Sequence, residues 1–160
     1  MIVHQHQGKN ECLLTTVAML AACPLDTVRA FVLRFTGRPW QDVFDGRAEY
    51  ARVAHEVVRQ FLGTQVAARY SELLGSVKSV VPCGGRPGLP YLRQCPAGRG
   101  MLAVVQFDRW GRATRRHIMP FENGLVYDPS RHCATPYTWA EFRRVYRNWR
   151  VERVQQVQED

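Results

Sequence analysis

Residues 81–100 form a stretch rich in proline and glycine that divides the chain into two parts of different hydrophobic periodicity. The stretch holds four prolines and five glycines, residue types that interrupt helices and interior strands. Apolar residues recur at helical spacing before it, and short apolar runs alternate with turn sequences after it. Helices followed by strands predict an α+β fold, with a helical cluster packed on a small antiparallel sheet. We expect the stretch itself to be a loop that serves as a lid or binding edge.

The helical part begins with a helix that should be buried. Asn10 is of a residue type that caps helices, so we expect the first helix to begin at Glu11 and to end near Cys23. Apolar side chains cover most of its surface, which is typical of a central helix. Further helices are expected over residues 26–36, 47–62 and 138–146, with a short helical turn over 71–74.

The second part carries the strand signals. Residues 101–107 are a continuous apolar run, as expected of an interior strand, and further strands are expected over 113–121, over 125–127 and from Trp149. The chain of 160 residues has the length of a single domain, so we assign residues 1–160 to one unit.

The composition is that of a globular chain with reduced thiols. Apolar residues make up 46% of the sequence, and no run approaches the roughly 20 apolar residues that span a bilayer. Residues 2–12 are mostly polar, unlike a signal peptide. Five cysteines, an odd number, argue against a disulfide framework. We therefore expect a chain that is made and kept in the cytosol and has no membrane partner.

The chain is strongly basic, with a formal net charge of +8. All its cations except Lys9 and Lys78 are arginines. One interpretation is a solvated surface, and another is a nucleic-acid-binding module, which we favour less. The second interpretation would place on one face Arg109, Arg112, Arg115 and Arg116 together with Arg143, Arg144, Arg147 and Arg150.

Cys12 lies where a polar segment, His4 to Asn10, gives way to the first apolar helix. A cysteine at a helix N-terminus faces unpaired backbone N–H groups, which favour the thiolate, the form that attacks carbonyl carbons. Cysteine is also among the most buried residue types, so the alternative is a small apolar side chain that only packs. Its position alone leaves both interpretations open.

His117 and Asp128 supply a candidate base and its orienting acid. A two-residue turn at Asn123-Gly124 would make them diagonal neighbours on one face of a hairpin, and a turn centred on Glu122-Asn123 would place them directly opposite. In either register the carboxylate could orient the imidazole while it takes a thiol proton. The alternative is a buried histidine bonded to a carbonyl group. His132 is a poorer candidate base, because it follows Arg131 far from any expected strand.

Gln5 and Gln7 lie just upstream of Cys12 and are both of a type that can donate a hydrogen bond to an oxyanion. His4 and His6 could bind a metal ion with Cys83, Cys95, His132 or Cys133, but no typical metal-ligand spacing occurs. We therefore expect no metal ion and no cofactor.

Three short pieces together resemble the papain-like cysteine peptidase superfamily, especially its compact forms similar to the C39 bacteriocin-processing peptidases. They are Gln7 to Leu20 with Glu11-Cys12, His117-Ile118, and Tyr127-Asp128-Pro129. The resemblance implies a helix packed on an antiparallel sheet, Cys12 as nucleophile, His117 as base and acid, and Asp128 as its orienter.

It also implies an oxyanion-hole glutamine. The family usually places this residue six positions before the cysteine, where this chain has His6. We favour Gln7, because Gly8 lets the following loop bend, with Gln5 as the alternative.

The function expected from the sequence is a peptidase or related acyl-transfer enzyme acting on a peptide or isopeptide bond. Its substrate would lie extended near residues 82–100, and the cationic surface would favour acidic or phosphate-bearing partners. Two alternatives remain at this stage, a catalytically inert papain-like interaction protein and the nucleic-acid-binding module. The oligomeric state is left open.

Overall fold

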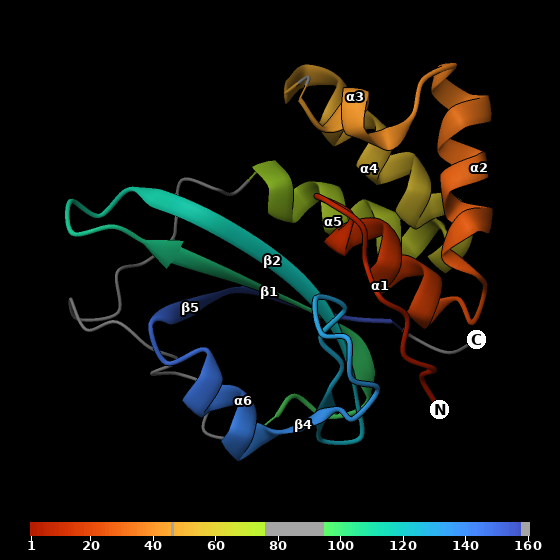
Figure 1. Cartoon of the computed structure of the whole chain (residues 1–160). Coiled ribbons are helices and arrows are strands. Elements are labelled where there is room, and N and C mark those ends of the chain that lie inside the picture. The colour runs from red at the N-terminus through yellow and green to blue at the C-terminus, as the bar shows by residue number, and fades with distance from the viewer. Residues whose placement is uncertain (46, 76–94, 158–160) are drawn as a thin grey trace.

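The computed structural model describes residues 1–45, 47–75 and 95–157, without the side chains of residues 47, 48 and 71–75. Within these ranges the fold is α+β, with six helices and one five-stranded antiparallel sheet. Figure 1 shows that the first five helices gather on one side of the sheet and the sixth lies on the other. Most of the expected loop, residues 76–94, lies outside the described residues.

The helices are α1 (Cys12–Leu20), α2 (Leu25–Thr36), α3 (Trp40–Phe44), α4 (Arg47–Leu62), α5 (Thr64–Gly75) and α6 (Trp139–Val145). Helical periodicity located α2 and α4 to within one residue. The five-residue α3 was not predicted. It begins after Pro39, which precedes the first helical residue in an extended conformation.

The sheet is built from β1 (Arg99–Phe107), β2 (Ala113–Glu122), β3 (Leu125–Val126), β4 (Tyr137–Thr138) and β5 (Trp149–Gln156). Its strand order is β4-β3-β2-β1-β5. The long hairpin of β1 and β2 forms its centre and extends outward past the helices (Figure 1). The two-residue strand β4 was not predicted.

Two hydrophobic clusters hold the layers together, one on each face of the sheet. Every residue of α1 after Cys12 is buried, because this helix lies between the other helices and β2. On the opposite face, Phe142 and Tyr146 from the α6 segment pack against Leu102, Val104 and Met119. The expectation of a central first helix is therefore confirmed.

The turn between β2 and β3 settles the hairpin register. Phe121 pairs with Val126 and Glu122 with Leu125, which leaves Asn123 and Gly124 as a two-residue turn. Both turn residues have positive φ, 52° and 83°, as a type I′ turn requires. Of the two registers considered from the sequence, this is the one that makes His117 and Asp128 diagonal neighbours.

No single helix in the described ranges has the length and apolar composition needed to cross a bilayer. The pair α1 and α2 passes such a test only when taken together, and it is bent by 118° at the break.

Candidate active site

Cys12 is the first residue of α1 and is partly exposed. The expected cap was wrong: Glu11, not Asn10, occupies the cap position, and no side chain caps the helix. Asn10 instead adopts a left-handed conformation with φ 59°, and its carbonyl oxygen accepts a hydrogen bond of 2.7 Å from Nε1 of Trp40. The backbone N–H groups at the start of α1 are therefore left without a side-chain cap beside the sulfur.

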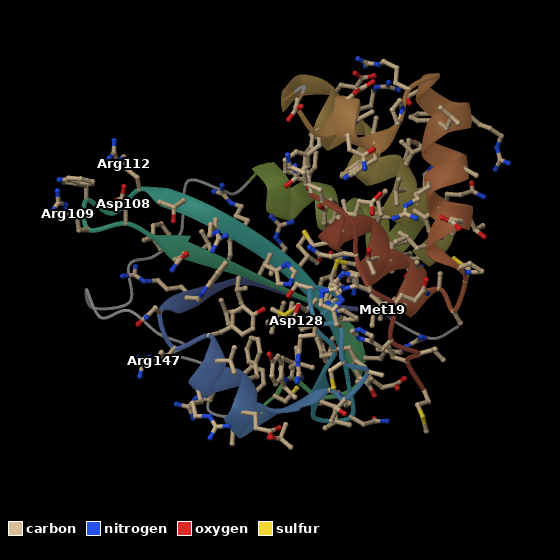
Figure 2. All side chains as sticks on the ribbon, viewed as in Figure 1. Met19, Asp108, Arg109, Arg112, Asp128 and Arg147 are labelled. Atoms are coloured by element: carbon tan, nitrogen blue, oxygen red, sulfur yellow. The ribbon has the colours of Figure 1, made fainter. Side chains whose placement is uncertain are left out.

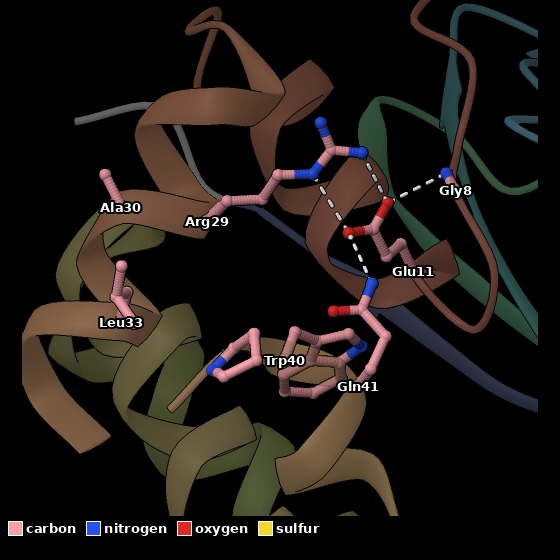
Figure 3. Close-up of a pocket in the computed structure, with 8 residues that line it drawn as sticks. Gly8, Glu11, Arg29, Ala30, Leu33, Trp40 and Gln41 are labelled. Carbon is pink, nitrogen blue, oxygen red and sulfur yellow. Dashed lines mark hydrogen bonds and ion pairs between the residues drawn. The ribbon is translucent and has the colours of Figure 1, made fainter. Parts of the chain in front are cut away.

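Glu11 fixes the loop that precedes the nucleophile helix. Its carboxylate is buried and accepts hydrogen bonds of 2.6 and 2.9 Å from the Arg29 guanidinium and one of 2.8 Å from the backbone N–H of Gly8 (Figure 3). Burial alone would raise the pKa of Glu11, but the contacts with Arg29 and Gly8 lower it overall. A Cβ at Gly8 would lie 2.2 Å from Oε2 of Glu11, so a larger residue would displace this carboxylate.

A pocket of about 310 Å³ lies on the outer side of the same loop (Figure 3). Glu11, Arg29 and Trp40 line it, whereas Cys12, His117 and Asp128 do not. The polar atoms of the Glu11 carboxylate are already bonded to the protein. We therefore interpret its walls as the support of the loop rather than as the place where chemistry occurs.

His117 and Asp128 come together at the open edge of β2. β3 pairs with β2 only at Phe121 and Glu122, so no strand among the described residues borders the β2 edge beside His117. Nε2 of His117 lies 2.8 Å from Oδ1 of Asp128, and both side chains are buried. The interaction with the Cys12 thiol is among the causes that raise the pKa of His117, and Nδ1 is the ring nitrogen that Asp128 does not engage. The three residues therefore form one connected group.

The electrostatics of this group favour the charged forms of both the imidazole and the carboxylate. Burial alone would lower the pKa of His117, but hydrogen bonds and attraction to Asp128 and Cys12 raise it to about 9. Burial would likewise raise the pKa of Asp128, yet the bonds from His117, Ser130 and Tyr146 hold it well below its usual range. At neutral pH His117 is therefore an imidazolium beside an ionised carboxylate.

Tyr146 and Ser130 complete the shell around Asp128, and the sequence analysis did not identify either. Oη of Tyr146 donates a 2.6 Å hydrogen bond to Oδ2, while the backbone N–H and Oγ of Ser130 donate bonds of 2.9 and 2.6 Å to Oδ1. The Tyr146 ring also stacks against the His117 ring at 6.3 Å. The only signal for Tyr146 in the sequence is its position four residues after Phe142, which places both side chains on one face of a helix.

Gln5 and Gln7 have different roles in the structure. The Gln5 amide holds the connection between α1 and α2, because it donates to the carbonyl oxygen of Cys23 and accepts from the N–H of Leu25. Oε1 of Gln7 is buried and has no hydrogen-bond partner in the part of the chain that the structure describes. The Gln7 backbone N–H donates to the carbonyl oxygen of Pro129 at 2.8 Å. Gln7 therefore has the uncommitted amide of the two.

The remaining histidines near the N-terminus form a separate surface cluster. The His6 and His132 rings stack at 4.0 Å, and both His4 and His6 contact the carbonyl oxygen of Arg131. His132 is exposed and packs on His6, whereas the Cys12 thiol is bonded to His117. Among the described residues, no three His, Cys, Asp or Glu side chains are placed to hold a metal ion. Cys83 lies outside the described residues.

Comparison of the chain with protein-family models, with curated proteins and with solved structures finds no match.

Proposed function

We propose that this chain is a papain-like cysteine peptidase, or a related acyl-transfer enzyme, that acts on peptide or isopeptide bonds. The observation that carries the proposal is the connected group of Cys12, His117 and Asp128. The thiol lies at the uncapped start of α1 and interacts with an imidazole, which a buried carboxylate orients through a 2.8 Å hydrogen bond. A catalytic triad consists of a nucleophile, a base that contacts it, and an acidic group that orients the base.

In the first half of the reaction, His117 holds the proton that the Cys12 thiol gives up, and the thiolate attacks the substrate carbonyl carbon. As the tetrahedral intermediate collapses, Nδ1 of His117 returns the proton to the leaving nitrogen, the C–N bond breaks, and a thioester on Cys12 remains. Asp128 keeps Nε2 of the ring protonated, so Nδ1 stays the nitrogen that exchanges the proton.

In the second half, water or another amine attacks the thioester. His117 accepts a proton from this nucleophile, and the Cys12 thiolate leaves the carbonyl carbon as the C–S bond breaks, which restores the thiolate beside the imidazolium. Negative charge on the carbonyl oxygen would be stabilised by the backbone N–H of Cys12 and by the Gln7 amide. A half-turn of that amide exchanges its oxygen and nitrogen, so the NH₂ group can donate where Oε1 now has no partner. The Gln5 amide is already committed elsewhere.

Selective alkylation of Cys12 is the first test. We expect iodoacetamide near pH 6.5 to label Cys12 in the wild-type protein, and the rate to fall about tenfold or more in His117→Ala, because the imidazolium no longer favours the thiolate. Mass spectrometry of digested peptides would measure each cysteine separately.

Cys133 is the internal control. It is exposed, and hydrogen bonds from Thr135 lower the pKa of its thiol, so it should react as well, but at a rate that does not depend on His117. Burial raises the pKa of Cys23 and Cys95, which should react slowly. Equal dependence of Cys12 and Cys133 on His117, or no dependence for either, would contradict the proposal. Labelling of Cys12 that depends on His117, without hydrolysis of any peptide, would indicate the catalytically inert interaction protein instead.

A further inference from the structure

The basic charge of the protein is concentrated in its sheet. Residues 95–157 contain eleven arginines and five carboxylate side chains, a net charge of +6, whereas the helical ranges 1–45 and 47–75 have a net charge of only +1. Several helical cations are paired with carboxylates, including Arg29, Arg38 and Arg59. The excess positive charge therefore lies in residues 95–157, the part of the chain that also contains His117 and Asp128.

Three of these arginines share one face of the sheet. Arg116 and Arg150 both pair with Val105, on its two sides, and Arg153 pairs with Ala103 one step further along. Val105 and Ala103 are two positions apart on β1, which corresponds to about 6.6 Å along the strand. The register of β5 shifts between Ala103 and Val104, and this bulge keeps Arg150 and Arg153 on the same face although they are three residues apart. We call Arg116, Arg150 and Arg153 the arginine row.

The inner end of the arginine row lies under the first five helices, which include α1 with Cys12, on the sheet face opposite to the His117 side chain. The Arg153 guanidinium lies 5.3 Å from the ring centre of Tyr70 in α5, so this face of the sheet is the one that the first five helices cover. The Tyr70 hydroxyl is bonded to that of Tyr50, and both tyrosines interact electrostatically with Cys12. Burial, as the main cause, raises the pKa of Tyr70 to about 12, so neither the ring nor its hydroxyl offsets the positive charge beside the nucleophile.

Beyond the row lies the tip of the β1–β2 hairpin, between Phe107 and Ala113. Trp110 is 64% exposed there, and the guanidinium groups of Arg109 and Arg112 lie 4.1 and 4.9 Å from its ring centre. Figure 2 shows Arg109 and Arg112 at the end of the hairpin, far from Asp128. Two carboxylates offset part of the charge, Asp108 against Arg112 and Glu152 against Arg116. No described ion pair engages Arg109, Arg150 or Arg153.

We propose that the arginine row binds an extended acidic polypeptide and that such segments are the substrate class of this site, an inference that rests on the proposed function. In an extended chain, alternate side chains point the same way and repeat at about the spacing that separates Arg150 from Arg153 along the sheet. Guanidinium groups bind carboxylates with two parallel hydrogen bonds, which lysine cannot do. A peptide is favoured over a nucleic acid because the tyrosines beside the inner end of the row interact with Cys12, a thiol that would attack carbonyl groups.

Binding can be measured separately from cleavage in a Cys12→Ser protein. The probes are fluorescein-labelled dodecapeptides of alternating Glu and Ala, and of alternating Gln and Ala. We expect the Glu–Ala peptide to bind at least about tenfold tighter at low salt, with the difference shrinking as salt rises. The double variant Arg116→Gln/Arg150→Gln should lose most of this difference. Its charge-matched control is Arg34→Gln/Arg59→Gln, two exposed positions on α2 and α4.

Each other outcome overturns a stated part of the proposal. If the affinity difference between the Glu–Ala and Gln–Ala peptides fell equally in the two double variants, only net charge would matter. This result would refute the row as a binding site. Tighter binding of an oligothymidylate of the same charge, lost in the row variant, would assign the row to nucleic acid. Tight peptide binding through the row without wild-type cleavage of the same peptide would refute the peptidase and leave the row in place. Cleavage of the Glu–Ala and Gln–Ala peptides at equal rates would leave the peptidase and refute the substrate class.

Discussion

The candidate active site is assembled from two halves that are held in different ways. On the helical side, Cys12 has few polar contacts of its own, and its position depends on the Glu11–Arg29 pair and on Trp40 beneath the preceding loop. On the sheet side, His117 is part of a buried hydrogen-bond network that ends at Asp128. This difference indicates that packing of the preceding loop controls the position of Cys12, whereas the hydrogen-bond network controls the charge of His117. Variants in the two halves should therefore fail in different ways.

The largest effect is expected from Asp128→Asn. The substitution keeps the shape of the side chain but removes the charge that stabilises the imidazolium, so peptide hydrolysis should fall by at least about 100-fold. Kinetics measured from pH 5 to 10 should show a loss of this size at every pH. A variant with more than a tenth of the wild-type rate would mean that the carboxylate only packs against the ring.

A second effect should appear in the pH dependence of stability. The pKa of His117 is raised from 6.5 to about 9 in the folded protein, so its contribution is fully present below pH 6.5 and is lost as pH rises through 9. The free energy of unfolding should therefore fall by up to about 3 kcal/mol across this window. Urea unfolding at pH 6 and pH 9.5 would measure it.

His117→Gln is the control for this measurement, because the buried thiols and tyrosines with raised pKa also lose stability as pH rises. Only the difference between the wild-type and variant slopes belongs to the imidazole. Parallel slopes for the two proteins would contradict the charged state assigned to His117.

The helical half is tested by Arg29→Met. The substitution leaves the buried Glu11 carboxylate without its cation, and we expect a loss of about 2 kcal/mol in the free energy of unfolding. Because this half controls geometry, kcat should also fall while the shape of its pH profile stays unchanged. Arg34→Met, an exposed position on the same helix, is the matched control. A shifted pH profile in Arg29→Met would show that the two halves are not separate.

The smallest effect is expected from Tyr146→Phe. It removes one donor to Asp128 and keeps the stacked ring, so activity should fall by about tenfold or less. The NMR titration of His117 should shift, because the carboxylate would interact more strongly with the ring. An unchanged titration would make Tyr146 a packing residue only.

The sequence predicted the local parts of this architecture better than its long-range contacts. Apolar spacing located α2 and α4, and the helix expected from residue 138 is present as α6, where Thr138 and Glu141 form a capping box, because these signals depend on neighbouring residues. Asn123-Gly124 predicted the hairpin for the same reason. The predictions from sequence were wrong where contacts between distant residues determine the local structure. Asn10 does not cap α1, because its carbonyl is bonded to Trp40 thirty residues away.

The residues around the candidate site show the same limit. His117 and Asp128 are eleven residues apart, and one turn relates them, so their proximity could be predicted. Arg29 and Tyr146 act through contacts that depend on how α2 and α6 pack, whereas Ser130 bonds to Asp128 only two residues away. Sequence alone also could not separate Gln5 from Gln7, since both are of the right type and only their bonding partners differ.

The backbone bond from Gln7 to Pro129 has a consequence for how the protein can open. It joins the segment before the nucleophile directly to the segment after the acid, so separating the two halves by any motion must break it. The exchange of the Gln7 amide proton with solvent deuterium should therefore report how often the segments that carry Cys12 and Asp128 separate, and it can be measured without any substrate.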